Sequence, residues 1–357
     1  MIPVTKIYLP DKGKYKKYID RIYDAGWLTN NGPLVRELEQ RLQEYLGVKH
    51  LILVANGSLA LQLAYKALDL KGEVITTPFS FVATTSTLAW EGLKPVFADI
   101  ESSSFNIDPM EIGEKLTGQT SAIVPVHVFG NPCDIDAIQG IADEHNLKVI
   151  YDAAHAFGVK YKDQSVLNFG EISTLSFHAT KLFHTIEGGA IVTNDDELAN
   201  KARLLMNFGI TGPSSIESLG INAKMNEFEA AMGLCVLDDI EQIKEQREEI
   251  WQVYQQALAG IVEFQQFNTN ATNNYAYAPV LFESEQLLLN VEKTLKNNQV
   301  IPRRYFHPSL DTLDYLQATK VCKKSRDVAS RILCLPMYTG LAHEEQLNIV
   351  NMVKTCL

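Results

Sequence analysis

The chain has 357 residues, of which 46% are hydrophobic and 21% charged, and its formal net charge is −11. This composition is that of an ordinary globular protein, and it excludes a largely disordered or fibrous chain. The acidic balance also argues against a nucleic-acid-binding protein, whose surface would be basic.

The length suggests two domains. Five cysteines without a C-x-x-C motif predict free thiols in a reducing compartment rather than a zinc site or a disulfide scaffold. No apolar run is long enough for a signal peptide or a membrane-spanning helix. We therefore expect a cytoplasmic protein that has no membrane or nucleic-acid partner.

The first elements alternate between helices and strands. Apolar residues at helical spacing predict helices up to Gly26 and over 34–45. An apolar run over 51–55, the turn Asn56-Gly57-Ser58 and an almost wholly apolar helix over 59–68 then form a βα unit. A helix of that composition is expected to be buried.

Further short apolar runs predict a mostly parallel sheet covered by helices. They lie at 73–76, 94–97, 122–128, 148–151, 174–177 and 190–193, with a helix over 134–145 among them. The sequence Asn226-Glu227-Phe228-Glu229 resembles a capping box that opens one long helix, which continues through Glu249. A strand over 277–282 and helices over 285–297 and from His343 follow. We expect a large domain over 1–240 and a smaller α/β domain over 241–357.

Candidate site residues stand at the ends of the predicted strands, where parallel sheets collect their ligands. Gly57-Ser58 suits a phosphate at a helix N-terminus, or is an ordinary turn with a cap. Asp152 is a partly buried carboxylate that balances a cation or caps a turn. Lys181 is a reactive amine in a pocket or a surface lysine. The spacing of His155, His178 and His184 fits no metal site, so we expect no metal.

Taken in order, these motifs resemble the DegT/DnrJ/StrS family of sugar aminotransferases. The resemblance is carried by Gly57-Ser58, Phe81, Asp152-Ala153-Ala154-His155, Ser176-Phe177-His178-Ala179-Thr180-Lys181, Glu187-Gly188-Gly189 and Gly220-Ile221-Asn222. It implies an aspartate-aminotransferase-like α/β fold, pyridoxal 5'-phosphate (PLP) fold type I, with a mostly parallel seven-stranded sheet in the large domain. It also implies PLP as the cofactor.

The same resemblance implies a role for each matching residue. Lys181 would hold PLP covalently and later move a proton, and Asp152 would keep the pyridine nitrogen protonated. His155 would reach the phenolic oxygen, and Phe81 would stack on the ring. The phosphate would lie among Gly57, Ser58 and Ser176, joined by Asn222 of a second subunit in a homodimer with shared active sites.

The resemblance also suggests the reaction. His178-Ala179-Thr180-Lys181 is similar to family members that aminate C4 of the sugar, with L-glutamate as donor and a dTDP-4-keto-6-deoxy sugar as acceptor, for surface-glycan synthesis. A C3 aminotransferase, a UDP-linked substrate and a non-catalytic PLP-binding regulator remain alternatives.

Contacts to the sugar nucleotide are expected from two further segments. The expected substrate-binding residues are Thr29, Asn30, Tyr305 and His307, although the family often has Tyr where His307 stands. Arg303, Arg304 and Lys224 are candidates for binding the pyrophosphate.

Overall fold

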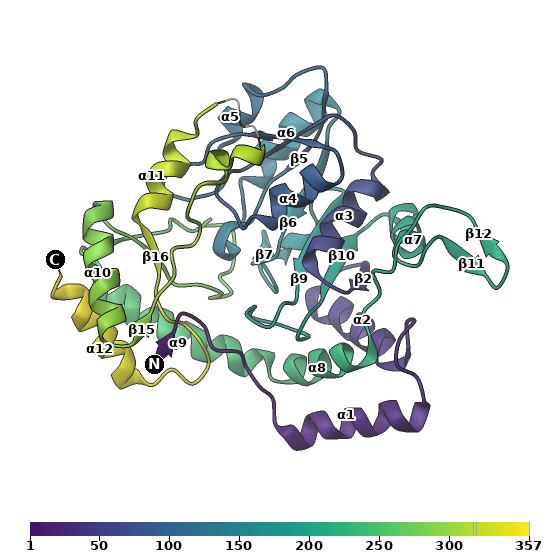
Figure 1. Ribbon diagram of the computed structural model, residues 1–357, viewed down its shortest axis with the longest axis horizontal. Helices are drawn as coiled ribbons and strands as arrows, with labels where there is room; N and C mark the ends of the chain where they lie inside the picture. The colour runs from purple at the N-terminus through teal and green to yellow at the C-terminus, as the bar shows by residue number, and fades with distance from the viewer. Residues whose placement is uncertain (317, 319, 357) are drawn as a thin grey trace.

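A seven-stranded sheet forms the centre of the protein (Figure 1). The computed structural model describes residues 1–316, 318 and 320–356. The strand order is β2-β10-β9-β6-β5-β3-β4, and the strands are β2 (His50–Val54), β10 (Gly189–Thr193), β9 (Ile172–Ser176), β6 (Lys148–Asp152), β5 (Thr120–Val124), β3 (Glu73–Thr76) and β4 (Lys94–Phe97). Only β10 runs antiparallel to its neighbours among these strands. The expectation of a mostly parallel sheet is therefore confirmed.

Helices cover both faces of this sheet. They are α2 (Pro33–Leu46), α3 (Gly57–Ala67), α4 (Ala83–Trp90), α5 (Pro109–Gly113), α6 (Ile135–His145), α7 (Asp196–Leu205) and α8 (Glu227–Asp238). The first helix, α1 (Lys12–Ala25), packs against α8 on the side away from the sheet (Figure 1). Leu42 of α2 and Leu234 of α8 belong to the core on one face, and Leu61 of α3 and Ala202 of α7 to the core on the other. Burial on both faces explains why the strands are apolar without alternation.

The single long helix expected after Asn226 is two helices. The capping box is confirmed, because the Asn226 side chain accepts from the backbone N–H of Glu229 and the Glu229 side chain accepts from that of Asn226. The first of these two helices, α8, ends at Asp238, and Asp239 separates it from α9 (Ile240–Leu258). The Asp239 carboxylate accepts hydrogen bonds from Tyr8 and Lys14 at this junction. Those tertiary contacts are invisible in the helical pattern.

The second half of the chain has its own hydrophobic cluster, built from α9 and the elements after it. These are β13 (Glu263–Phe264), β14 (Pro279–Leu281), α10 (Glu285–Asn297), β15 (Val300–Ile301), β16 (Ile332–Cys334) and α12 (His343–Lys354). The remaining helix, α11 (Lys323–Arg331), contributes Val328 and Ala329 to a separate cluster. The first strand, β1 (Ile2–Pro3), pairs with β15, so the N-terminus lies against this half. The division into domains near residue 240 stays a prediction.

Several short elements were not expected. They are the hairpins β7 (Lys160–Tyr161) with β8 (Gln164–Ser165) and β11 (Ile210–Gly212) with β12 (Ser215–Ile216). The β11–β12 hairpin projects from the body of the protein (Figure 1). In contrast, β5 is shorter than the run over 122–128, because Pro125 has no N–H to continue the strand. No helix among the described residues is long and apolar enough to cross a membrane.

Candidate active site

A cavity of about 280 Å³, the lysine pocket, opens at the carboxyl ends of β2, β6 and β9. Nine of the residues predicted from the sequence line it: Gly57, Ser58, Phe81, Asp152, His155, Ser176, Lys181, Arg303 and Tyr305. They come from segments far apart in the chain, and the sheet brings them together because the ends of parallel strands share one edge.

Asp152 is the last residue of β6 and is buried. Its Oδ2 accepts a hydrogen bond from Thr84 Oγ1 at 2.7 Å, and its Oδ1 accepts one from the backbone N–H of Ala154 at 3.1 Å. Burial raises the pKa of the carboxyl above its usual value, and these hydrogen bonds and the nearby Lys181 offset only part of that rise. The carboxylate is thus held in a fixed orientation with a cationic amine close by.

Lys181 lies in the turn that follows β9. Its Nζ donates a hydrogen bond to the Tyr277 hydroxyl at 3.2 Å. Burial lowers the pKa of the amine from 10.5 to about 8, against the opposing influence of Asp152 and Tyr305. An amine that loses its proton this close to neutral pH is suited to nucleophilic attack on a carbonyl carbon.

His155 presents a hydrogen-bond donor to the lysine pocket. Its Nδ1 accepts from the backbone N–H of Phe129 at 3.2 Å, so this nitrogen carries no proton. Burial, followed by the influence of Lys181, holds the pKa of the ring well below its usual value. The imidazole is therefore neutral, and its proton is on Nε2.

The part of the lysine pocket at the N-terminus of α3 is suited to an anion. The helix α3 begins at Gly57, and the Asn56 side chain caps it through the N–H of Leu59. The first N–H groups of a helix have no intrahelical acceptor, and together with the helix dipole they favour a phosphate. A Cβ atom on Gly57 would lie 2.8 Å from Cβ of Ser176, so only glycine allows the Ser176 side chain this close.

Two aromatic residues flank the mouth of the lysine pocket. Phe81 is 50% exposed, a high value for a side chain of its size. The guanidinium of Arg303 lies 4.4 Å from the centre of the Tyr305 ring. Phe81, Arg303 and Tyr305 also line an adjoining cavity of about 340 Å³, which His307 lines as well. His307 is thus beside the lysine pocket rather than in it.

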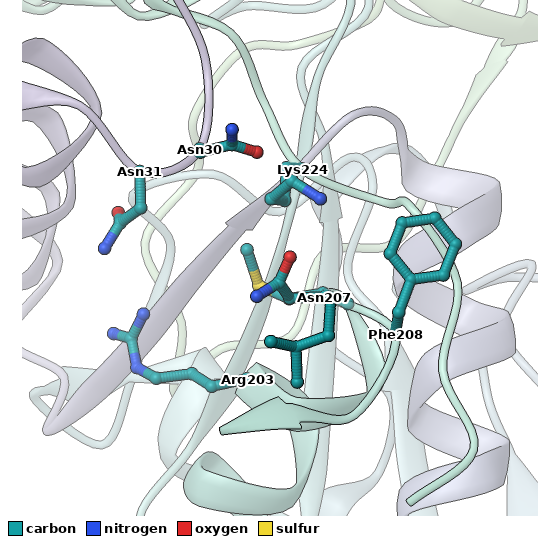
Figure 2. Close-up of a pocket in the computed structure, with 8 residues that line it drawn as sticks. Asn30, Asn31, Arg203, Asn207, Phe208 and Lys224 are labelled. Atoms are coloured by element: carbon teal, nitrogen blue, oxygen red, sulfur yellow. The ribbon is translucent and has the colours of Figure 1, made fainter. Parts of the chain in front are cut away.

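The other expected residues lie elsewhere. Asn30 lines a separate cavity of about 430 Å³, the basic pocket, together with Arg203, Asn207 and Lys224 (Figure 2). Asn222 forms a β-bridge with Asn207 at its edge, and the nearby Thr29 is exposed. None of these residues lines the lysine pocket. Among the described residues, no three potential metal ligands gather at one point.

Among the lining residues that the sequence pattern did not reveal, two bond to the ionisable groups of the lysine pocket. Thr84 contacts Asp152, and Tyr277 contacts Lys181. A signal existed for Thr84, because three threonines within residues 84–87 are unusual in a helix unless their hydroxyls are used. For Tyr277 the only signal was its place in a run expected to be a strand.

The fold and this site together define a class of protein. A lysine with a lowered pKa, a buried carboxylate, a neutral histidine donor and a helix N-terminus for a phosphate match what PLP requires, so the residues present fit this cofactor. The fold and the site are those of a PLP-dependent enzyme of fold type I.

Comparison with known proteins identifies the family. Residues 11–354 match the model of the DegT/DnrJ/EryC1/StrS aminotransferase family, and the chain belongs to it. The chain is 45% identical to a dTDP-4-amino-4,6-dideoxy-D-glucose transaminase of Shigella dysenteriae, with 98% of each chain covered. It is 40% identical to an enzyme of the same name from Escherichia coli, over 99% of this chain and 98% of that one.

A solved structure agrees closely with the fold. The crystal structure of DesI in the presence of its TDP-sugar product superimposes with a TM-score of 0.94 and 35% identity, covering 99% of this chain and 92% of that chain. The expected family, fold, cofactor and sugar-aminotransferase activity are confirmed. The roles of the individual site residues stay predictions.

Proposed function

We propose that the enzyme transfers the amino group of L-glutamate to C4 of dTDP-4-keto-6-deoxyglucose. The products are dTDP-4-amino-4,6-dideoxyglucose and 2-oxoglutarate, made in the cytoplasm for O-antigen or other surface-glycan synthesis. The observation that carries the proposal is the 45% identity, over 98% of both chains, with a transaminase named for that amino sugar.

Three residues of the lysine pocket would do the chemistry. When bound, PLP supplies a ring that takes up electrons from the carbon next to the amine. Lys181 would hold the cofactor and, once its amine is free, carry a proton on Nζ. Asp152 would accept a hydrogen bond from the pyridine nitrogen and keep it protonated. His155 would donate from Nε2 to the phenolic oxygen.

Four other residues would position the cofactor. Gly57, Ser58 and Ser176 surround the space at the N-terminus of α3 and would bind the phosphate. Phe81 projects beside the lysine pocket and would stack on the ring.

The basic pocket supports a shared active site. Asn30 and Lys224 line it and Asn222 lies at its edge, although none of these three lines the lysine pocket. Large apolar side chains lie exposed on the adjacent β11–β12 segment, among them Ile216 at 73% and Leu219 at 75%. Such a surface favours burial against a second copy. We propose a homodimer in which Asn222 binds the phosphate in the partner's site, with Thr29 and Asn30 beside it.

The sugar nucleotide would enter past Tyr305 and His307. Of the candidate pyrophosphate ligands, Arg303 is exposed at the lysine pocket, whereas Arg304 is engaged with Glu285 and with the carbonyl of Ser330. Arg303 is therefore the better candidate within the chain. Lys224 would act from the partner subunit.

A panel of keto sugars tests the substrate. The purified enzyme with PLP and L-glutamate is incubated with dTDP- and UDP-linked 4-keto sugars and with a dTDP-linked 3-keto sugar, and the products are measured by mass spectrometry. We expect the highest kcat/KM for the dTDP-linked 4-keto sugar. A preference for the 3-keto or the UDP-linked sugar would contradict the proposal. Absence of amino transfer from glutamate to any sugar would favour a non-catalytic PLP-binding protein.

A further inference from the structure

We propose that Thr84 is a positioning residue for Asp152 and that Ser80 fixes the direction of its hydroxyl. The inference rests on the proposed function, because it assumes that Asp152 faces the pyridine nitrogen. It assigns a role to Ser80, between β3 and α4, and to Thr84 in α4: together they would hold the carboxylate that contacts the pyridine nitrogen.

The hydrogen bonds allow only one arrangement of protons. Thr84 Oγ1 lies 2.7 Å from Asp152 Oδ2 and 2.8 Å from Ser80 Oγ. A hydroxyl has one proton to donate, and an ionised carboxylate can only accept. Thr84 therefore donates to Asp152, and Ser80 must donate to Thr84.

Burial makes this chain of hydroxyls effective. Ser80 is 3% exposed and Thr84 is 1% exposed, so water does not compete for their hydrogen bonds. Asp152 is held on its other oxygen by the N–H of Ala154. The carboxylate is thus fixed at both oxygens.

The backbone around Thr84 also stabilises the negative charge of Asp152. Helix α4 begins at Ala83, and no side chain caps its N-terminus. Thr84 is in the first turn, so the positive end of the helix dipole lies beside the carboxylate. Asp152 also experiences the charge of Lys181. Burial is the main cause of the raised pKa of Tyr65 and Tyr277, and the nearby charge of Asp152 adds to it. Of the side chains around Asp152, Thr84 supplies the neutral donor that leaves the carboxylate charged.

The consequence concerns the cofactor. A carboxylate held by a hydroxyl would keep its direction and favour its charged form, and would thereby help to keep the pyridine nitrogen of bound PLP protonated. Without that donor, the buried carboxylate turns or takes up a proton. Such supporting hydrogen bonds commonly change activity about 10- to 100-fold when removed.

The test compares Thr84→Val with a matched control, Thr85→Val. Both changes remove a buried hydroxyl from α4, but Thr85 Oγ1 donates its hydrogen bond to the backbone carbonyl of Val82 and not to Asp152. Three quantities are measured for each variant. Titration of the apoenzyme gives the PLP affinity, visible circular dichroism reports the environment of the bound ring, and a steady-state assay with L-glutamate as donor gives kcat. We expect Thr84→Val to weaken PLP binding about tenfold, to change the dichroism and to lower kcat about 10- to 100-fold, while Thr85→Val stays at the wild-type values.

Two further variants make the result decisive. Thr84→Ser keeps the hydroxyl and should restore all three readouts to within about threefold of wild type; failure of this rescue would mean that packing alone matters and would overturn the proposal. Ser80→Ala leaves Thr84 in place, and we expect a smaller loss of about threefold. Wild-type behaviour of both Thr84→Val and Ser80→Ala would equally overturn it.

Asp152→Asn separates this inference from the proposed function. If Asp152→Asn binds PLP and turns over normally, then the assumed role of Asp152 is wrong. If Asp152→Asn is impaired and Thr84→Val behaves like Thr85→Val, then only the role of Thr84 is wrong.

Discussion

The lowered pKa of Lys181 predicts how fast the apoenzyme captures PLP at different pH values. Only the neutral amine attacks the aldehyde of the cofactor. With the pKa at about 8 instead of 10.5, the neutral fraction at pH 7 is about 9% rather than about 0.03%, a gain of about 300-fold. Burial causes this gain, and the charge of Asp152 limits it because a nearby carboxylate favours the ammonium form.

The assay is a stopped-flow measurement of PLP binding to the apoenzyme between about pH 6 and pH 10. The second-order rate should rise about tenfold per pH unit at low pH and level off near pH 8, where half of the Lys181 amines are neutral. Asp152→Asn removes the negative charge that favours the ammonium form, so its plateau should begin at a lower pH. A rate still rising tenfold per unit above pH 9 would refute the reasoning, because the amine would then have an ordinary pKa.

Three shorter predictions follow from the site and its surroundings. Lys181→Ala should abolish turnover, and release of 2-oxoglutarate by this variant would contradict the mechanism. Because the change only removes a half-buried amine from a cavity, the thermal unfolding midpoint should stay within about 2 °C of wild type. Gly57→Ala should weaken PLP binding at least tenfold through its contact with Ser176, but should weaken pyridoxal binding less, because pyridoxal lacks the phosphate. Leu219→Glu on the exposed segment should shift the protein toward monomers in sedimentation analysis, whereas an unchanged dimer would place the interface elsewhere.

The main elements of the large sheet could be predicted because each carries a local signal. Residues 73–76 and 94–97 are short apolar runs, and both are strands with those bounds. The capping box at Asn226 was equally local. What failed depended on distant contacts: the helix break at Asp239 is held by Tyr8 and Lys14, more than two hundred positions away in the chain.

The site shows the same division between local and distant information. Lys181, Asp152 and Gly57 were identified because each sits at a strand end with a distinctive neighbour sequence, and the sheet brings them together. Tyr277 could not be identified in this way. It comes from the second half of the chain, and its hydrogen bond to Lys181 depends on how that half packs against the sheet.

The position of Asn222 gives the sharpest test of the proposed dimer. The residue ends the motif Gly220-Ile221-Asn222 that contributes to the resemblance, yet it lies at the edge of the basic pocket rather than in the lysine pocket of its own chain. If it acts in the partner's site, Asn222→Asp should be inactive because its charge repels the phosphate, and Lys181→Ala should be inactive for lack of the amine.

Mixing these two inactive variants then distinguishes the two arrangements. Random exchange of subunits makes about half of the dimers mixed, and each mixed dimer has one site that combines a normal Lys181 with a normal Asn222 from the other chain. About a quarter of all sites would be intact, so about a quarter of the wild-type activity should return. If Asn222 instead acted within its own chain, every site in the mixture would lack one of the two groups, and no activity would return however long the subunits exchanged.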